Sequence, residues 1–140
     1  MKRKERCELL IHCRARFLSK WAKQMCEEAE MNLLEEPSTG LTMINMRESA
    51  KQSLFYLGEV LISEAKVECR GHIGIGMIVG NELQKAYDLA VIDAGYQAEL
   101  AIILRFEQEL MKEKKWIDEQ RAIQNQNILK TRVSFETMDV

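Results

Sequence analysis

The stretch GHIGIGMIVGNELQKAYDLA, residues 71–90, holds four glycines within ten positions, and a run with helical periodicity follows at once. Such a segment is either a loop that holds a phosphate or a strand. A dinucleotide fingerprint needs G-x-G-x-x-G, but Gly80 lies one residue too far beyond Gly74 and Gly76. A P-loop needs Gly-Lys-Ser/Thr, and here Asn follows Gly80. We therefore interpret the stretch as a strand whose glycines make room for a bulky neighbour.

The segments that precede this stretch also alternate with the two-residue period of strands. Residues 41–47 and 54–69 both have this pattern, and Gly58 within the second segment indicates a bulge or a close backbone approach. Arg70 and Gly71 predict a turn into the glycine-rich strand. Short strands with tight connections predict an antiparallel sheet of three to five strands within residues 41–79.

Helical periodicity lies on both sides of the predicted sheet. Residues 5–31 predict one long amphipathic helix, which the segment that contains Pro37 ends. Residues 82–130 predict two further helices, the first with a capping-box spacing between Asn81 and Gln84 and the second with a polar far half. Residues 131–140 return to alternation and predict a strand-like C-terminal arm. We expect a single α+β domain over residues 1–140, with the antiparallel sheet packed against these helices.

The composition is that of a cytoplasmic protein with an uneven charge. The net charge is −2, yet residues 2–23 hold eight Lys or Arg and two Glu, which gives +6 there and −8 elsewhere. Such a basic segment suggests nucleic acid, a membrane surface or another subunit as a partner. Four cysteines form no disulfide pattern, and no apolar run of about 18 residues predicts a membrane span.

Residues that could carry chemistry are present but scattered. Cys69 and His72 are spaced like metal ligands across a turn, but the only other such pair, His12 and Cys13, lies within the predicted N-terminal helix. Buried structural cysteines are therefore the favoured interpretation. The carboxylates that could act in catalysis, with no pattern to pair them, are Glu59, Glu64 and Asp93. Two alternatives stay open: a nucleotide- or anion-binding module that uses Gly74–Gly80, and a nucleic-acid binder that uses the basic helix.

Five patterns occur in order along the chain: TGL (39–41), F-x-x-G-E (55–59), G-x-x-G-x-x-x-x-V-G (71–80), A-x-x-x-A-x-x-D-A (86–94) and TRV-x-F-x-TM (131–138). Together they resemble the PhnG subunit family of the bacterial carbon–phosphorus lyase system. The resemblance covers about residues 39–94 and 128–138, and the tail pattern is its most specific part.

The resemblance implies a place in a core complex with the PhnH, PhnI and PhnJ subunits. This system displaces adenine from ATP and attaches an alkylphosphonate to the ribose triphosphate. A radical enzyme that uses S-adenosylmethionine and an iron–sulfur cluster later cuts the carbon–phosphorus bond. The resemblance assigns the first reaction to PhnI and the radical reaction to PhnJ, with PhnG required but without an assigned catalytic residue.

We therefore expect a non-catalytic subunit that assists formation of ribose 1-alkylphosphonate 5-triphosphate and is inactive alone. We expect no catalytic, metal or cofactor-binding residue in this chain, and neither nucleic acid nor a membrane as its partner. A homodimer is a further form open to the isolated chain. Because apolar anchors at alternating positions suit strand addition, the tail should contact the partner subunits. The residues assigned to this interface are Arg132, Val133, Phe135, Thr137 and Met138.

Overall fold

The computed structural model describes the backbone of residues 2–47, 50 and 53–138, and the side chains of residues 2–45, 50, 53–54 and 58–130. The chain forms two compact units. One unit is Arg14–Ile103, and the other combines Met1–Cys13 with Leu104–Val140. Whether the two units together make the single domain that we expect stays a prediction.

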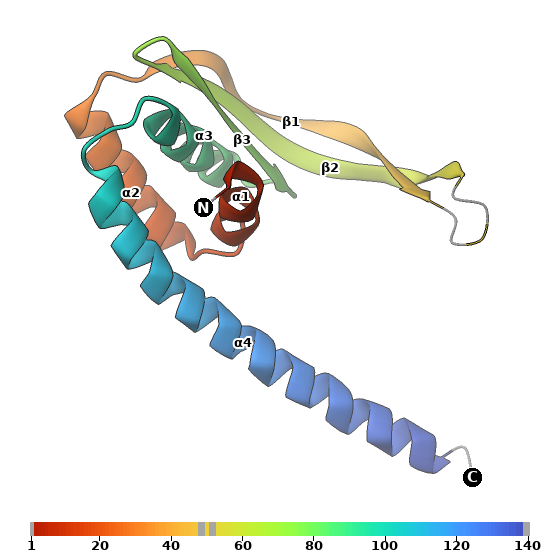
Figure 1. Cartoon of the computed structure of the whole chain (residues 1–140). Coiled ribbons are helices and arrows are strands. Elements are labelled where there is room, and N and C mark those ends of the chain that lie inside the picture. The colour runs from red at the N-terminus through yellow and green to blue at the C-terminus, as the bar shows by residue number, and fades with distance from the viewer. Residues whose placement is uncertain (1, 48–49, 51–52, 139–140) are drawn as a thin grey trace. The chain divides into compact units, whose positions relative to one another are not determined.

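The first unit is built on a three-stranded antiparallel sheet, which confirms the predicted α+β class. Its strands are β1 (Asn32–Arg47), β2 (Leu54–Cys69) and β3 (His72–Val79), with β2 in the centre (Figure 1). β1 begins well before residue 41, so Pro37 lies inside a strand. Proline is tolerated there because β1 is an edge strand and its pairing with β2 shifts register between Glu35 and Ser38.

The predicted turn at Arg70 and Gly71 is confirmed. These two residues have φ angles of 50° and 83°, and they connect the directly paired residues Cys69 and His72. Two-residue hairpin loops with positive φ at both positions match the right-handed twist of the strands they join. The turn therefore fixes the register of the whole β2–β3 pair.

Helix α3 (Leu83–Gln97) covers one face of the sheet, and α2 (Ala15–Glu28) packs against α3. The face under α3 includes the buried side chains of Ala65 and Val67 on β2, which lie opposite Gly76 and Gly74 on β3. On the other face of β3, apolar side chains are exposed instead. They are Ile73, Ile75, Met77 and Val79.

Gly74 and Gly76 let the backbone of α3 lie directly on β3. A Cβ atom on Gly74 would overlap the Ala90 carbonyl oxygen and the Ala94 amide, and one on Gly76 would overlap the Ala86 carbonyl oxygen. The bulky neighbour inferred from the sequence is thus a helix backbone. This packing confirms a strand at residues 72–79 and leaves no phosphate-binding loop between Gly74 and Val79.

The start of α3 is held by β2 rather than by a capping box, so the predicted pairing of Asn81 with Gln84 is wrong. The Ser63 hydroxyl accepts a hydrogen bond from the Glu82 amide (2.8 Å) and donates one to the Gly80 carbonyl (2.6 Å). Ser63 is fully buried. Gln84 instead donates to the Asp88 carboxylate one turn further along α3 (3.0 Å). A distant serine therefore supplies the acceptor for the N-cap amide that the N3 side chain supplies in a capping box.

The predicted long N-terminal helix is wrong, because the chain forms two shorter helices, α1 (Arg3–Leu10) and α2. After Leu10 the amides of residues 12 and 13 bond to carbonyls three residues back, which tightens and ends the turn. The Cys13 thiol also donates to the Leu9 carbonyl (3.4 Å). Arg14 is then extended (ψ 140°). The basic residues of the N-terminal segment are therefore divided between two helices that belong to different units.

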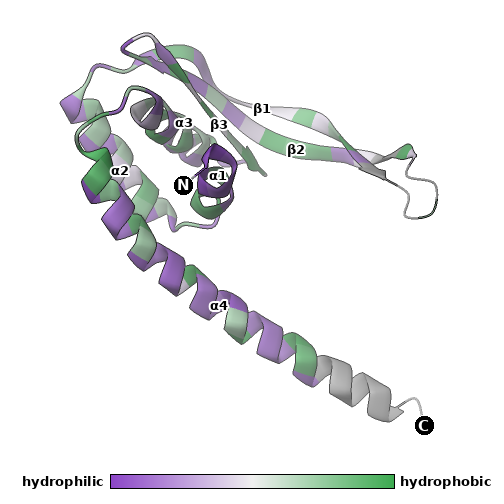
Figure 2. Ribbon diagram, viewed as in Figure 1, coloured by the Kyte–Doolittle hydropathy of each residue, from purple (hydrophilic) through white to green (hydrophobic). Residues whose placement is uncertain are grey.

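The second unit contains α1 and the long helix α4 (Ile103–Met138), whose first residue closes the other unit. Phe106, Leu110 and Ile117 form a buried stripe on α4, whereas every side chain from residue 118 to 130 is exposed. Figure 2 shows the polar character of this far half. None of the helices in the described part of the chain is long and apolar enough to cross a membrane.

The C-terminal arm is helical where a strand pattern was expected. The backbone of residues 131–138 continues α4, and residues 139 and 140 lie outside the described residues. A strand needs a neighbour for its backbone groups, whereas a helix satisfies them within itself, and α4 already supplies the preceding turns. Two-residue alternation alone was therefore a poor guide in this segment.

Candidate functional site

The three candidate carboxylates do not come together. Glu59 and Glu64 both lie on β2, but five positions apart, so their side chains point to opposite faces of the sheet. Asp93 is buried on α3 and accepts a hydrogen bond from the Ile75 amide of β3 (3.0 Å). Asp93 thus has a structural partner, and no pair of these acids is placed for acid–base catalysis.

The candidate metal ligands are equally dispersed. Cys69 is buried and His72 exposed at the β2–β3 turn, whereas His12 and Cys13 belong to the other unit. Among the residues that the structure describes, no group of three or more His, Cys, Asp or Glu side chains could hold a metal ion.

A polar cluster lies where α2 packs on α3. The Cys26 thiol of α2 is hydrogen-bonded to the Tyr87 hydroxyl, and burial raises the pKa of both groups. The nearby Asp88 carboxylate raises the pKa of Cys26 further. A thiol with a raised pKa remains protonated near neutral pH and is a poor nucleophile. The cluster therefore joins two helices and offers no activated cysteine.

Asp88→Asn is expected to stabilise the protein at neutral pH. Burial raises the pKa of Asp88 above its ordinary value of 3.8, so the folded state binds this proton more tightly than the unfolded state. The contribution of Asp88 to the free energy of unfolding must then fall as the pH rises from about 3.8 through the raised pKa. Asparagine carries no such charge and retains an acceptor for Gln84.

Urea unfolding of both proteins at pH 3.5 and pH 7 measures this effect. The variant should be the more stable at pH 7, and the difference should shrink at pH 3.5. Asp118→Asn, at an exposed position on α4, serves as the control and should change stability by less than about 0.5 kcal/mol at either pH. Equal differences at both pH values for Asp88→Asn would contradict the assignment.

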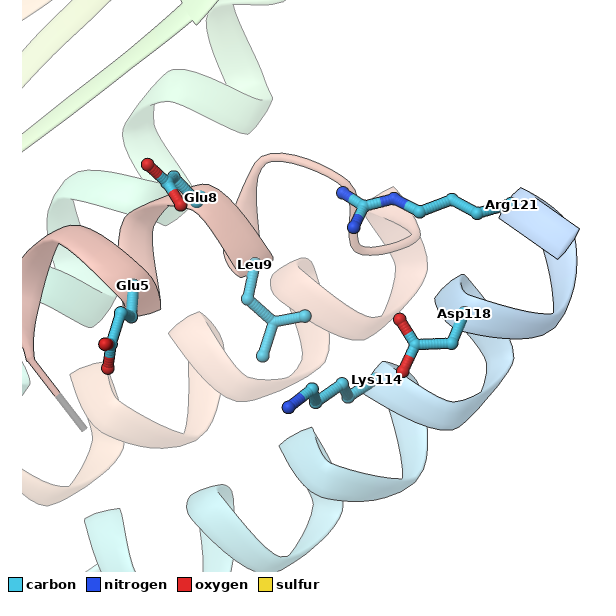
Figure 3. A pocket seen from close by; sticks show the side chains of 6 residues that line it. All are labelled: Glu5, Glu8, Leu9, Lys114, Asp118 and Arg121. Carbon is cyan, nitrogen blue, oxygen red and sulfur yellow. The ribbon is translucent and has the colours of Figure 1, made fainter. Parts of the chain in front are cut away.

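The second unit contains an open pocket of about 400 Å³ between α1 and α4 (Figure 3). Its lining mixes three acids, two bases and one leucine, so it selects neither an anion nor a cation by charge. The lining residues are Glu5, Glu8, Leu9, Lys114, Asp118 and Arg121.

A second feature of the first unit is an arm formed by β1 and β2, residues 40–47 and 54–61. The last residue of β3, Val79, faces Ile62, so residues 54–61 of β2 pair with β1 alone. Figure 1 shows this two-stranded ribbon extending past β3 and α3. Its exposed fractions are high for apolar side chains: Leu41 67%, Met43 60%, Leu54 63% and Leu61 40%.

An isolated two-stranded ribbon is at best marginally stable in water, and contiguous exposed apolar residues indicate an interaction surface. The two-residue alternation predicts both strands but not the arm. The available signal was the length of the second predicted strand, residues 54–69, because it is twice as long as β3, which has eight residues.

The fold and this surface define an α+β protein whose candidate site is a surface for binding other chains. A family model for "Phosphonate metabolism protein PhnG" matches residues 1–139. The chain belongs to the PhnG family, and it is therefore a phosphonate metabolism protein and a subunit of a phosphonate metabolism complex. No individual curated protein matches the chain significantly in sequence.

The interface residues assigned from the tail pattern are not tested by this geometry. The backbone of α4 is helical at all five positions, which are Arg132, Val133, Phe135, Thr137 and Met138. The side chains of these residues lie outside the described residues. Their contact with partner subunits stays a prediction.

Proposed function

We propose that this chain is a non-catalytic subunit of the carbon–phosphorus lyase core complex. In that role it assists the formation of ribose 1-alkylphosphonate 5-triphosphate from ATP and a phosphonate, with displacement of adenine. Membership of the PhnG family supports the pathway. The observation that carries the subunit role is the exposed apolar arm of β1 and β2, which is suited to being covered by another chain.

The partners in this proposal are PhnI, PhnH and PhnJ. ATP, S-adenosylmethionine and the iron–sulfur cluster are bound by those subunits, and this chain completes their assembly. The helical C-terminal segment, residues 131–138, contributes a second contact through one or more of the five tail residues already named. A helix end with apolar side chains can serve as such an anchor as well as a strand can.

Reconstitution tests this role directly. PhnH, PhnI and PhnJ are co-expressed with or without the tagged chain, supplied with ATP and methylphosphonate, and assayed for adenine release by chromatography. Adenine should appear together with the ribosyl triphosphate phosphonate only when the chain is present, and the chain alone should release none. Adenine release by the purified chain alone, or full synthesis of the product without it, would overturn the proposal.

A chain that ends at Lys130 tests the tail contact within the same system. We expect it to fold, because every buried residue among the described side chains precedes residue 118, and to fail to co-purify with PhnI. Normal co-purification of the shortened chain would remove the tail from the proposed interface and leave the subunit role to the reconstitution.

A further inference from the structure

Three exposed apolar residues of the arm, Leu41, Met43 and Leu61, share one face of the ribbon. Leu41 lies directly opposite Leu61, and Met43 lies directly opposite Glu59. Directly opposed residues of an antiparallel pair project from the same face. Glu59 and Leu61 lie four and two positions before Ser63 on β2, and residues an even number of positions apart in a strand point to the same face. This is therefore the face that is buried further along β2.

The cover over this face stops where the arm begins. The Glu82 amide, at the start of α3, is hydrogen-bonded to Ser63, so the helix covers the sheet from Ser63 toward Cys69. Beyond Ser63 the same face continues without it, and Leu61 and Met43 are 40% and 60% exposed. The core-side face of the sheet is therefore longer than the helix that packs on it.

Charge on this face distinguishes between two classes of occupant. Glu59 is exposed, and it is the only charged residue among the described side chains of the arm. In a symmetric contact the same patch meets itself, and a two-fold axis through this four-residue patch would bring two Glu59 carboxylates close together and desolvate both. A different chain can instead place a basic side chain opposite Glu59.

We propose that the core-side face of the arm, made of Leu41, Met43 and Leu61 around Glu59, is a docking surface for another subunit of the complex. That subunit presents apolar side chains to the three apolar residues and one Lys or Arg to Glu59. This inference rests on the proposed function and adds to it a location and a chemistry for the contact. The opposite face of the sheet, with Met77, is not part of it.

Two methionines on opposite faces provide a matched test. Met43→Asp places a charge in the docking surface, and Met77→Asp makes the same change on β3 at a position that is 49% exposed. Each tagged variant is co-expressed with PhnH, PhnI and PhnJ and tested for co-purification. In a second experiment, the separately purified subunits are titrated against the purified variant to measure the strength of association. Met43→Asp should weaken association at least about 100-fold, because an unpaired carboxylate is buried on docking, whereas Met77→Asp should stay within about threefold.

Substitutions of Glu59 test the role of its negative charge in the same titration. Glu59→Lys should weaken association by about tenfold or more, and Glu59→Gln by less. Wild-type affinity should fall with added salt more steeply than that of Glu59→Gln. Circular dichroism and thermal unfolding of each isolated variant check folding. Glu59→Gln preserves the size of the side chain, so its altered salt dependence is a readout that a loss of folding would not produce.

The outcomes separate the two proposals. If the wild-type chain fails to associate with the other subunits, the proposed function fails and this inference fails with it. If the wild type associates and Met43→Asp associates equally well, only the docking surface is wrong. Equal losses for Met43→Asp and Met77→Asp, or a homodimer of the wild type that Met43→Asp dissociates, would also overturn the assignment of this face to a different subunit.

Discussion

Replacing Gly76 with alanine is expected to lower the free energy of unfolding by about 3 kcal/mol or more, or to prevent residues 14–103 from folding. The added Cβ would overlap the Ala86 carbonyl oxygen of α3. The obstructing atoms belong to the helix backbone, so no side-chain rotation can relieve the overlap. The helix would have to lift from β3, which would also expose the buried residues beneath it, such as Ala65.

The same substitution at Gly40 provides the control. Gly40 lies in β1, has no atom within 4 Å of an added Cβ and does not have a positive φ. Gly40→Ala should therefore be neutral or stabilising by a few tenths of a kcal/mol, through the lower entropy of its unfolded chain. Urea unfolding followed by circular dichroism compares the two variants. A Gly76→Ala protein as stable as Gly40→Ala would refute the close contact of α3 with β3.

Much of this sheet could be predicted because the signals are local. Two-residue alternation located β2 and β3, and the Arg70–Gly71 turn followed from the residue types that tolerate positive φ. The glycine pattern also predicted a crowded neighbour, since Gly74 and Gly76 lie on the same face of a strand. Only the nature of that neighbour, a helix backbone, required the structure.

The structure differs from the predictions where contacts between distant parts of the chain decide the conformation. Neither glycine nor proline marks the end of α1, and the break at residues 11–14 depends on hydrogen bonds that the periodicity does not reveal. The sequence predicts no strand around Pro37, because the tolerance of edge strands for proline can be applied only once the strand order is known. Residues 131–138 alternate like a strand but have no neighbouring strand among the described residues, and they continue a helix.

The candidate site was the least predictable part. The sequence shows that Ser63 and Asp93 are polar. It does not show that their hydrogen-bond partners lie 17 to 19 residues away on another element. Exposure of the arm depends on the point at which β3 and α3 end, which is a property of the assembled sheet. Asp93 shows this most clearly, because its type suggested catalysis and its position shows a structural role.

Replacing Asp93 with alanine is expected to lower the free energy of unfolding by about 2 kcal/mol. In a two-residue hairpin the pair next to the turn, Cys69 and His72, exchanges hydrogen bonds, and such pairs then alternate along the strands. Ile75, opposite Lys66, is therefore in a non-bonded pair, and its amide points away from β2. The buried Asp93 carboxylate accepts this amide at 3.0 Å. In Asp93→Ala, the Ile75 amide at the edge of the sheet loses its charged acceptor.

Asp93→Asn is the matched variant, since its side-chain oxygen can still accept from Ile75. It should be destabilised by about 1 kcal/mol or less, because it loses only the charge of the acceptor. Hydrogen exchange provides a local readout: the Ile75 amide should exchange faster in Asp93→Ala than in Asp93→Asn. An open edge is also a template for another strand, so Asp93→Ala should aggregate more readily during refolding. Equal stability and equal Ile75 protection in the two variants would show that Asp93 does not hold this edge.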